Sequence, residues 1–117
     1  MNTTVKQREY FEKRLDYWAR KVCPAIRPRL QKGDTAEHCL AEVVTYLKDS
    51  AAYVCLDHKA GERPLSDFDE TALHEMLHSM LMPLCEPLEA TYSTDFVARI
   101  EHAIIFPLIN TLLRGDK

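Results

Sequence analysis

The chain of 117 residues has the size of one domain, so we expect a single domain over residues 1–117. Hydrophobic residues make up 46% of it and charged residues 28%, which excludes disordered and fibrous proteins. The longest apolar run falls far short of the roughly 18 residues that a membrane-spanning helix needs, and the first residues lack the apolar core of a signal peptide. We therefore expect a cytoplasmic protein that makes no membrane contact.

The net charge of −3 is unevenly distributed along the chain. Residues 1–32 hold nine Lys and Arg against three acids, a charge of +6, so the remaining 85 residues carry −9. A basic N-terminal element could contact nucleic acid or an acidic partner. The alternative, which we favour, is a solvated helix face with i,i+4 pairs such as Glu9–Lys13.

The first predicted element is a helix from about Val5 to Val22, because apolar residues recur there at helical spacing. Its apolar stripe consists of Phe11, Leu15, Trp18 and Val22. Pro24 ends the helix, since the residue before a proline is pushed out of the α region. We expect turns over residues 24–34, which contain a second proline and a Lys-Gly-Asp turn signal.

Residues 36–59 fit either a helix or two strands. Residues 43–47 and 52–56 are rich in β-branched and aromatic residues, and Lys48-Asp49-Ser50 between them has turn chemistry. An apolar stripe over residues 40–47 also fits a helix. The pattern favours a strand for the second run and does not decide the first.

The next predicted element is a helix from about Phe68 to Met82, with Ser66 or Asp67 as its N-cap. Pro83 is expected to stop this helix, and residues 84–91 are expected to form a loop.

The last predicted element is a helix capped by Ser93 or Thr94 that continues to about Leu113. Pro107 should bend it, and Gly115 is expected to lie beyond its end.

An HExxH motif, His74-Glu75-Met76-Leu77-His78, lies inside the second predicted helix. Residues at i and i+4 share one helix face, so both imidazoles can ligate one tetrahedral Zn²⁺. Glu75 lies beside that face, where it can take a proton from the zinc-bound water and later return it to a leaving amine. The motif therefore predicts a zinc site, against the alternative of two histidines that bind no metal.

A zinc site needs a third protein ligand, and the last predicted helix offers Glu101 and His102. Glu101 has apolar neighbours one turn away, where a carboxylate is costly unless it is paired or binds a metal. His102 could instead hydrogen-bond a ligand or the reaction intermediate. Cys85 is a weaker ligand candidate. Two imidazoles and a carboxylate would also suit Fe²⁺, Mn²⁺ or Co²⁺.

Four features occur in a familiar order: an acidic helix start, HEMLH, the apolar and proline segment SMLMPL, and a final helix with a glutamate (ARIEHAIIFPL). This order resembles the small HExxH proteins of phages and prophages, which are compact zinc metallopeptidases (zincins) similar to minigluzincins. The resemblance spans roughly residues 43–113. It implies an α+β, mainly helical fold with a small antiparallel hairpin or sheet near the HExxH helix, in the cytoplasm of a bacterium or phage-infected host.

The same resemblance implies zinc-dependent hydrolysis of a peptide or protein substrate. By this resemblance His74, His78 and Glu101 hold the zinc and Glu75 is the general base. The run 52–57 looks like the edge strand that zincins place over the active-site cleft, where a peptide pairs as an added strand.

The sequence leaves several alternatives open. SprT-like proteases, which act at DNA, carry HExxH with a histidine as third ligand, and that pattern would promote His102. The donor to the developing oxyanion could be Tyr53, Tyr92 or His102. The chain could also be a non-catalytic interaction protein stabilised by zinc, or a nucleic-acid-associated regulator that uses residues 1–32. Neither the substrate nor the oligomeric state can be read from the sequence.

Overall fold

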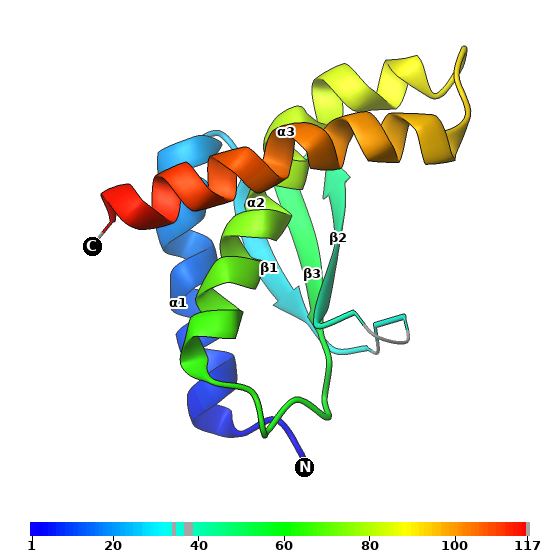
Figure 1. The fold of residues 1–117 in the computed structure, drawn as a ribbon. Coiled ribbons are helices and arrows are strands. Elements are labelled where there is room, and N and C mark those ends of the chain that lie inside the picture. The colour runs from blue at the N-terminus through cyan, green and yellow to red at the C-terminus, as the bar shows by residue number, and fades with distance from the viewer. Residues whose placement is uncertain (34, 37–38, 117) are drawn as a thin grey trace.

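The computed structural model describes residues 1–33, 35–36 and 39–116. Helices α1 (Val5–Val22) and α2 (Leu65–Leu88) lie side by side against a three-stranded sheet, and α3 (Thr94–Gly115) crosses α2 (Figure 1). This arrangement confirms the predicted α+β, mainly helical fold. The largest fully buried side chains between these layers are Trp18, Phe11, Phe68, Leu15, Leu56, Leu73, Met76, Leu77 and Ile105.

The first helix has the bounds that its apolar period predicts. Thr4 and Gln7 form a capping box, in which each side chain accepts a hydrogen bond from the other residue's backbone N–H. Trp18 is buried and donates its indole N–H to the Asp69 carboxylate of α2 at 2.8 Å. Arg14 donates to the same carboxylate at 2.6 Å, so part of the basic charge of the N-terminal segment is neutralised within the fold.

The sheet consists of β1 (Arg27–Gln31), β2 (Ala41–Tyr46) and β3 (Ala51–Leu56), in the order β1-β3-β2. β2 and β3 form the antiparallel hairpin of the two-strand interpretation, which is therefore confirmed. The connecting turn places Ser50 at a positive φ of 51°. β1 pairs with β3 in parallel, so the sheet is mixed rather than purely antiparallel.

Two predictions about the sheet were wrong. Residues 27–31 form a strand, although prolines suggested only turns; β1 is an edge strand, where a proline is tolerated. The run 52–57 is not the edge strand of the cleft, because β3 pairs on both sides. The edge strand facing α2 is β2.

The second helix is longer at both ends than its pattern predicted. It begins at Leu65 with Pro64 as N-cap and no side-chain cap, so neither Ser66 nor Asp67 plays that role. It also continues through Pro83 and Pro87, and the loop predicted for residues 84–91 shrinks to the short link before Ser93. Both prolines are exposed, so their rings take no space in the core.

The last helix begins as predicted, with the Ser93 side chain accepting from the Phe96 N–H at 3.1 Å. It ends two residues later than the predicted Leu113, because Gly115 is its final residue and not a residue beyond its end. α3 is the one helix in the described residues that is long and apolar enough to cross a membrane. Val97 and Ile105 of this helix are buried in the core, and 17% of its apolar window is buried. One such helix is weak evidence for a membrane span.

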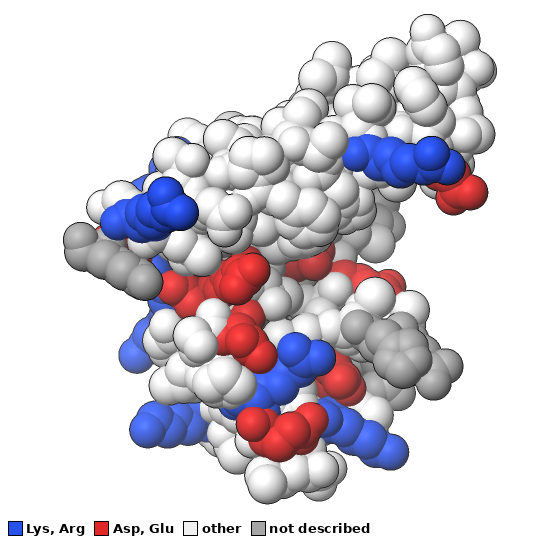
Figure 2. Space-filling view, viewed as in Figure 1, with Lys and Arg blue, Asp and Glu red and all other residues white. Residues whose placement is uncertain are grey.

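The outward face of α3 is unusually apolar. Four large side chains on this helix are exposed: Phe96, Ile100, Ile104 and Phe106. Figure 2 shows the surface over α3 as mostly uncharged, while acidic side chains gather in the band beneath it. The site described next lies where α3 meets α2 and β2.

Candidate metal centre

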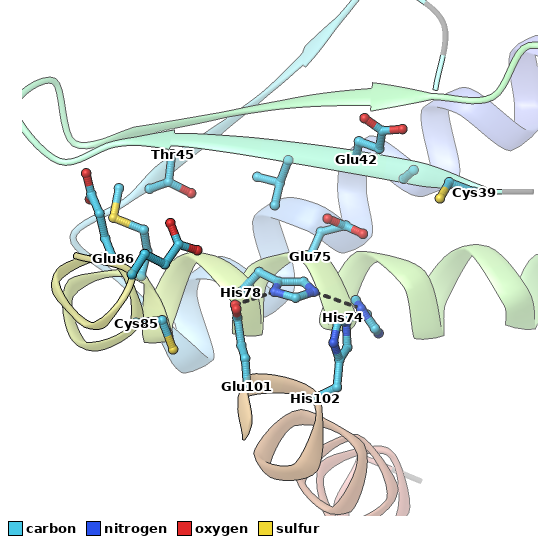
Figure 3. A pocket seen from close by; sticks show the side chains of 14 residues that line it. Cys39, Glu42, Thr45, His74, Glu75, His78, Cys85, Glu86, Glu101 and His102 are labelled. Atoms are coloured by element: carbon cyan, nitrogen blue, oxygen red, sulfur yellow. Dashed lines mark hydrogen bonds and ion pairs between the residues drawn. The ribbon is translucent and has the colours of Figure 1, made fainter. Parts of the chain in front are cut away.

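The HExxH motif lies in the middle of α2 and presents its side chains in two directions. His74 and His78 lie toward α3, whereas Glu75 points toward β2 (Figure 3). This division follows from helical geometry, since residues four apart share a face and the intervening residue is turned by about 100°. Packing fixes the helix, because Leu73, Met76 and Leu77 of the same turns are fully buried.

Three histidines converge between α2 and α3. His74, His78 and His102 each offer one ring nitrogen, and these atoms lie within 4.8 Å of one another. The Nε2 atoms of His74 and His78 are 3.0 Å apart. Two nitrogens bound to one tetrahedral zinc at about 2.0 Å would be separated by about 3.3 Å, so little movement is needed for both to share an ion. The donor set fits a first-row metal ion.

Hydrogen bonds orient two of these rings. His78 Nδ1 donates to the Glu101 carboxylate, which leaves Nε2 of His78 directed at His74. His102 Nδ1 donates to the backbone carbonyl of Ala98 at 2.8 Å, which leaves its Nε2 without a hydrogen. A carboxylate or carbonyl on the second ring nitrogen is the usual arrangement of metal-binding histidines.

Glu101 therefore stands in contact with His78 but on its other ring nitrogen. The convergent group contains His102, the alternative third ligand, and does not contain Glu101. The assignment of Glu101 as a metal ligand stays a prediction, and the structure adds a second role for it as the partner that orients His78.

Burial also suits His74 to metal binding. Its pKa is lowered to about 4 from 6.5, chiefly by burial and further by the nearby rings of His78 and His102. A lowered pKa keeps the imidazole neutral at neutral pH, which is the form that ligates a metal.

The pKa of Glu75 is shifted in the opposite direction, upward. It is 6% exposed, and no hydrogen bond to it is formed by any residue that the structure describes. Burial, followed by the charges of Glu42 and Glu101, raises its pKa to about 8 from 4.5. A carboxyl with a pKa near the ambient pH can both take up and release a proton, as a general base that later acts as an acid must do.

A cleft of about 620 Å³ opens between β2, α2 and α3 beside these groups. Val43 and Thr45 of the edge strand form one wall, and the HExxH residues form the other (Figure 3). Thr45 Oγ1 is hydrogen-bonded to Ser79 Oγ of α2 at 2.8 Å, which ties the edge strand to the motif helix.

The lining of the cleft distinguishes among the residues that the sequence offered as oxyanion donors and as a further metal ligand. His102 lines the cleft, whereas neither Tyr53 nor Tyr92 is among its described lining residues. His102 could donate to an oxyanion only with a proton on Nε2, because its Nδ1 is already bonded to Ala98. Cys85 also lines the cleft but lies outside the histidine cluster.

Sequence reasoning missed several residues of the cleft, among them Glu42, Thr45, Glu86 and Glu89. No local signal marks them, because they enter the cleft only through the packing of β2 and the continuation of α2 past Pro83.

No family model matches this chain, and no curated protein or solved structure is significantly similar to it. The family resemblance therefore rests on the motif and on the order of elements around it, and the functional argument rests on the geometry of the site.

Proposed function

We propose that this protein is a metal-dependent peptidase, with zinc as its ion, that hydrolyses peptide bonds in a peptide or protein substrate. One observation carries the proposal. Three histidine side chains converge within 4.8 Å beside a buried carboxyl, Glu75, that points into an open cleft. A structural zinc site needs no such free carboxyl and is normally closed by four protein ligands.

In this proposal a bound zinc ion would polarise the scissile carbonyl and make water more acidic. Glu75 takes the proton of the attacking water and returns it to the leaving amine. His102 lines the cleft and could either bind the metal through Nε2 or, with that nitrogen protonated, donate to the developing oxyanion; the ligand experiment below distinguishes the two.

The edge strand supplies the means of holding a substrate. β2 pairs with β3 on one side only, so the backbone groups of its other side are available to a peptide. An extended peptide added antiparallel to β2 would lie along Val43 and Thr45, across the cleft from Glu75. Backbone hydrogen bonds would then position the scissile bond without requiring a particular side-chain sequence.

Metal content is the first test. Mass spectrometry of tag-free protein should find about one zinc per chain, with loss of the metal in His78→Ala and retention in the control His58→Ala, which lies outside the cluster. Absence of metal from the folded wild type would remove the proposal. Glu75→Gln should keep its zinc and lose hydrolysis of a casein or peptide-library substrate. Unchanged activity in this variant would favour a non-catalytic, zinc-stabilised protein.

The third ligand requires its own comparison. If the three histidines hold the metal, His102→Ala should lose zinc, whereas Glu101→Gln should weaken metal binding by about 10- to 100-fold, as loss of a ligand's hydrogen-bond partner does. If Glu101→Ala loses the metal and His102→Ala retains it, the ligand set is the one that the family resemblance implies. Glu89→Ala, an exposed acid on the rim of the cleft, is the matched control.

A further inference from the structure

The cleft is strongly acidic. Five glutamates line it, of which Glu75 has a raised pKa, and no Lys or Arg is among the lining residues that the structure describes. These glutamates are Glu42, Glu75, Glu86, Glu89 and Glu101. A cleft lined by one sign of charge with low-dielectric walls concentrates ligands of the opposite charge. Figure 2 shows acidic side chains directly beneath α3 and basic ones lower on the same face.

Two of these acids lie at the C-terminal end of α2, where a negative charge is unfavourable. Glu86 lies in the last turn of α2 and Glu89 is its C-cap, and this last turn contains no basic residue. The C-terminal end of a helix carries a partial negative charge and normally attracts cations. Both side chains are exposed, and neither forms an ion pair with a described residue. The side chains of Glu86 and Glu89 and the helix end therefore contribute negative potential together, with no ion-pair partner among the described residues.

An independent observation shows that the cleft is built to receive a ligand. Glu75 is 6% exposed, has no hydrogen-bond partner among the described residues, and points into the cleft. No described side-chain polar atom is both fully buried and unpaired, so the Glu75 carboxyl keeps its remaining exposure toward the cleft, where an entering ligand can pair with it. Thr45 and Glu86 lie at one end of the cleft and Glu42 at the other, with Glu75 between them (Figure 3).

We propose that the substrates of this site are basic peptides, with a Lys or Arg side chain lying against Glu86 and Glu89 at the Thr45 end of the cleft. This inference rests on the proposed peptidase function and adds its substrate class. Met82 also lines the cleft and offers an apolar surface to the aliphatic stem of the basic side chain. The cationic group then reaches the two carboxylates while the peptide backbone stays paired to β2.

The test uses the zinc-loaded full chain and quenched-fluorescence peptides. One library carries Lys fixed in turn at each of the three positions on either side of the scissile bond, and a matched library carries Gln there. We expect a preference for Lys at one position that weakens with added salt, because exposed charges are screened. In Glu86→Gln/Glu89→Gln, kcat/KM for the preferred Lys peptide should fall about three- to tenfold, the size expected for two exposed ion pairs. The matched Gln peptide should be unaffected.

Two exposed acids away from the cleft provide the control. Glu62→Gln/Glu70→Gln makes the same change in net charge, so it should leave the Lys preference intact. Equal loss in both double variants, or equal hydrolysis of Lys and Gln peptides by the wild type, overturns the basic-substrate inference and leaves the peptidase proposal standing.

A binding measurement separates the two proposals if hydrolysis fails. The Glu75→Gln protein, loaded with zinc, is titrated into a fluorescently labelled Lys peptide and followed by anisotropy. The same titration is made with a protein that carries Glu86→Gln/Glu89→Gln in addition to Glu75→Gln. Binding that is about three- to tenfold weaker in this protein supports charge recognition in the cleft even when no peptide is cleaved. Binding that does not distinguish Lys from Gln overturns it.

Discussion

Burial of Glu75 makes a quantitative prediction about the metal-free protein. The pKa of this carboxyl is about 8 in the folded chain and 4.5 as its ordinary value. Because the folded pKa is the higher of the two, the unfolded chain releases its proton first. The contribution of Glu75 to stability is therefore fully present below pH 4.5 and is lost as the pH rises through 8.

The size of the effect follows from the same two values. Each pH unit inside this window costs about 1.4 kcal/mol, so between about pH 5 and pH 7.5 the wild type loses about 3 kcal/mol through Glu75. Glu75→Gln cannot ionise and should not show this loss. The variant should therefore be more stable than the wild type near pH 7.5 while being inactive, a trade-off expected at a catalytic carboxyl.

The assay is urea unfolding followed by the fluorescence of Trp18, the single tryptophan, which is buried in the core. Both proteins are treated with chelator, and Glu70→Gln, on the exposed face of the same helix, serves as control. The contribution of His74 to stability changes with pH in the opposite direction. Its lowered pKa of about 4 gives a contribution that is present above pH 6.5 and lost as the pH falls toward 4. This contribution is shared by both proteins, so the informative quantity is their difference at each pH.

One result would refute the reasoning. If the stability of Glu75→Gln and of the wild type changes in parallel between pH 5 and pH 7.5, Glu75 is not a buried ionisable group in solution. The argument for a poised general base would then fail, whatever the metal content of the protein.

Three further outcomes are expected. Leu77→Ala should lower the free energy of unfolding by about 2–5 kcal/mol in urea titrations, because Leu77 is fully buried and its loss leaves a cavity; a loss under about 1 kcal/mol would place it outside the core. Ser93→Ala should cost about 0.5–2 kcal/mol by the same method, since it removes the side-chain cap of α3, and Ser66→Ala, which caps nothing, should cost less. Zinc at a hundredfold excess over its dissociation constant should stabilise the wild type by about 2.7 kcal/mol in thermal scans, and His78→Ala should show no such gain.

The sequence by itself determined the features that depend on neighbours along the chain. The apolar period places α1 at Val5–Val22, and a local hydrogen bond places Ser93 at the start of α3. The HExxH spacing requires only a helix, so the convergence of His74 and His78 was predictable without knowledge of any other element. Short-range periodicity and capping carry this information because they involve residues within a few positions of one another.

Strand order could not be predicted in this way. Whether β2 or β3 borders the cleft depends on where β1 pairs, and that pairing joins residues more than twenty positions apart. The continuation of α2 past Pro83 is also a tertiary outcome, since α2 packs against α3 and Cys85, two residues beyond the proline, is buried.

The third member of the histidine cluster was decided by packing alone. Glu101 and His102 are adjacent on α3, and sequence pattern cannot tell which of them faces the open nitrogens of α2. Adjacent residues on a helix point about 100° apart, so the rotation of α3 about its own axis selects between them. Val97, Ile105 and Ile109 set that rotation by burying in the core, which turns His102 toward the cluster and Glu101 toward the second nitrogen of His78.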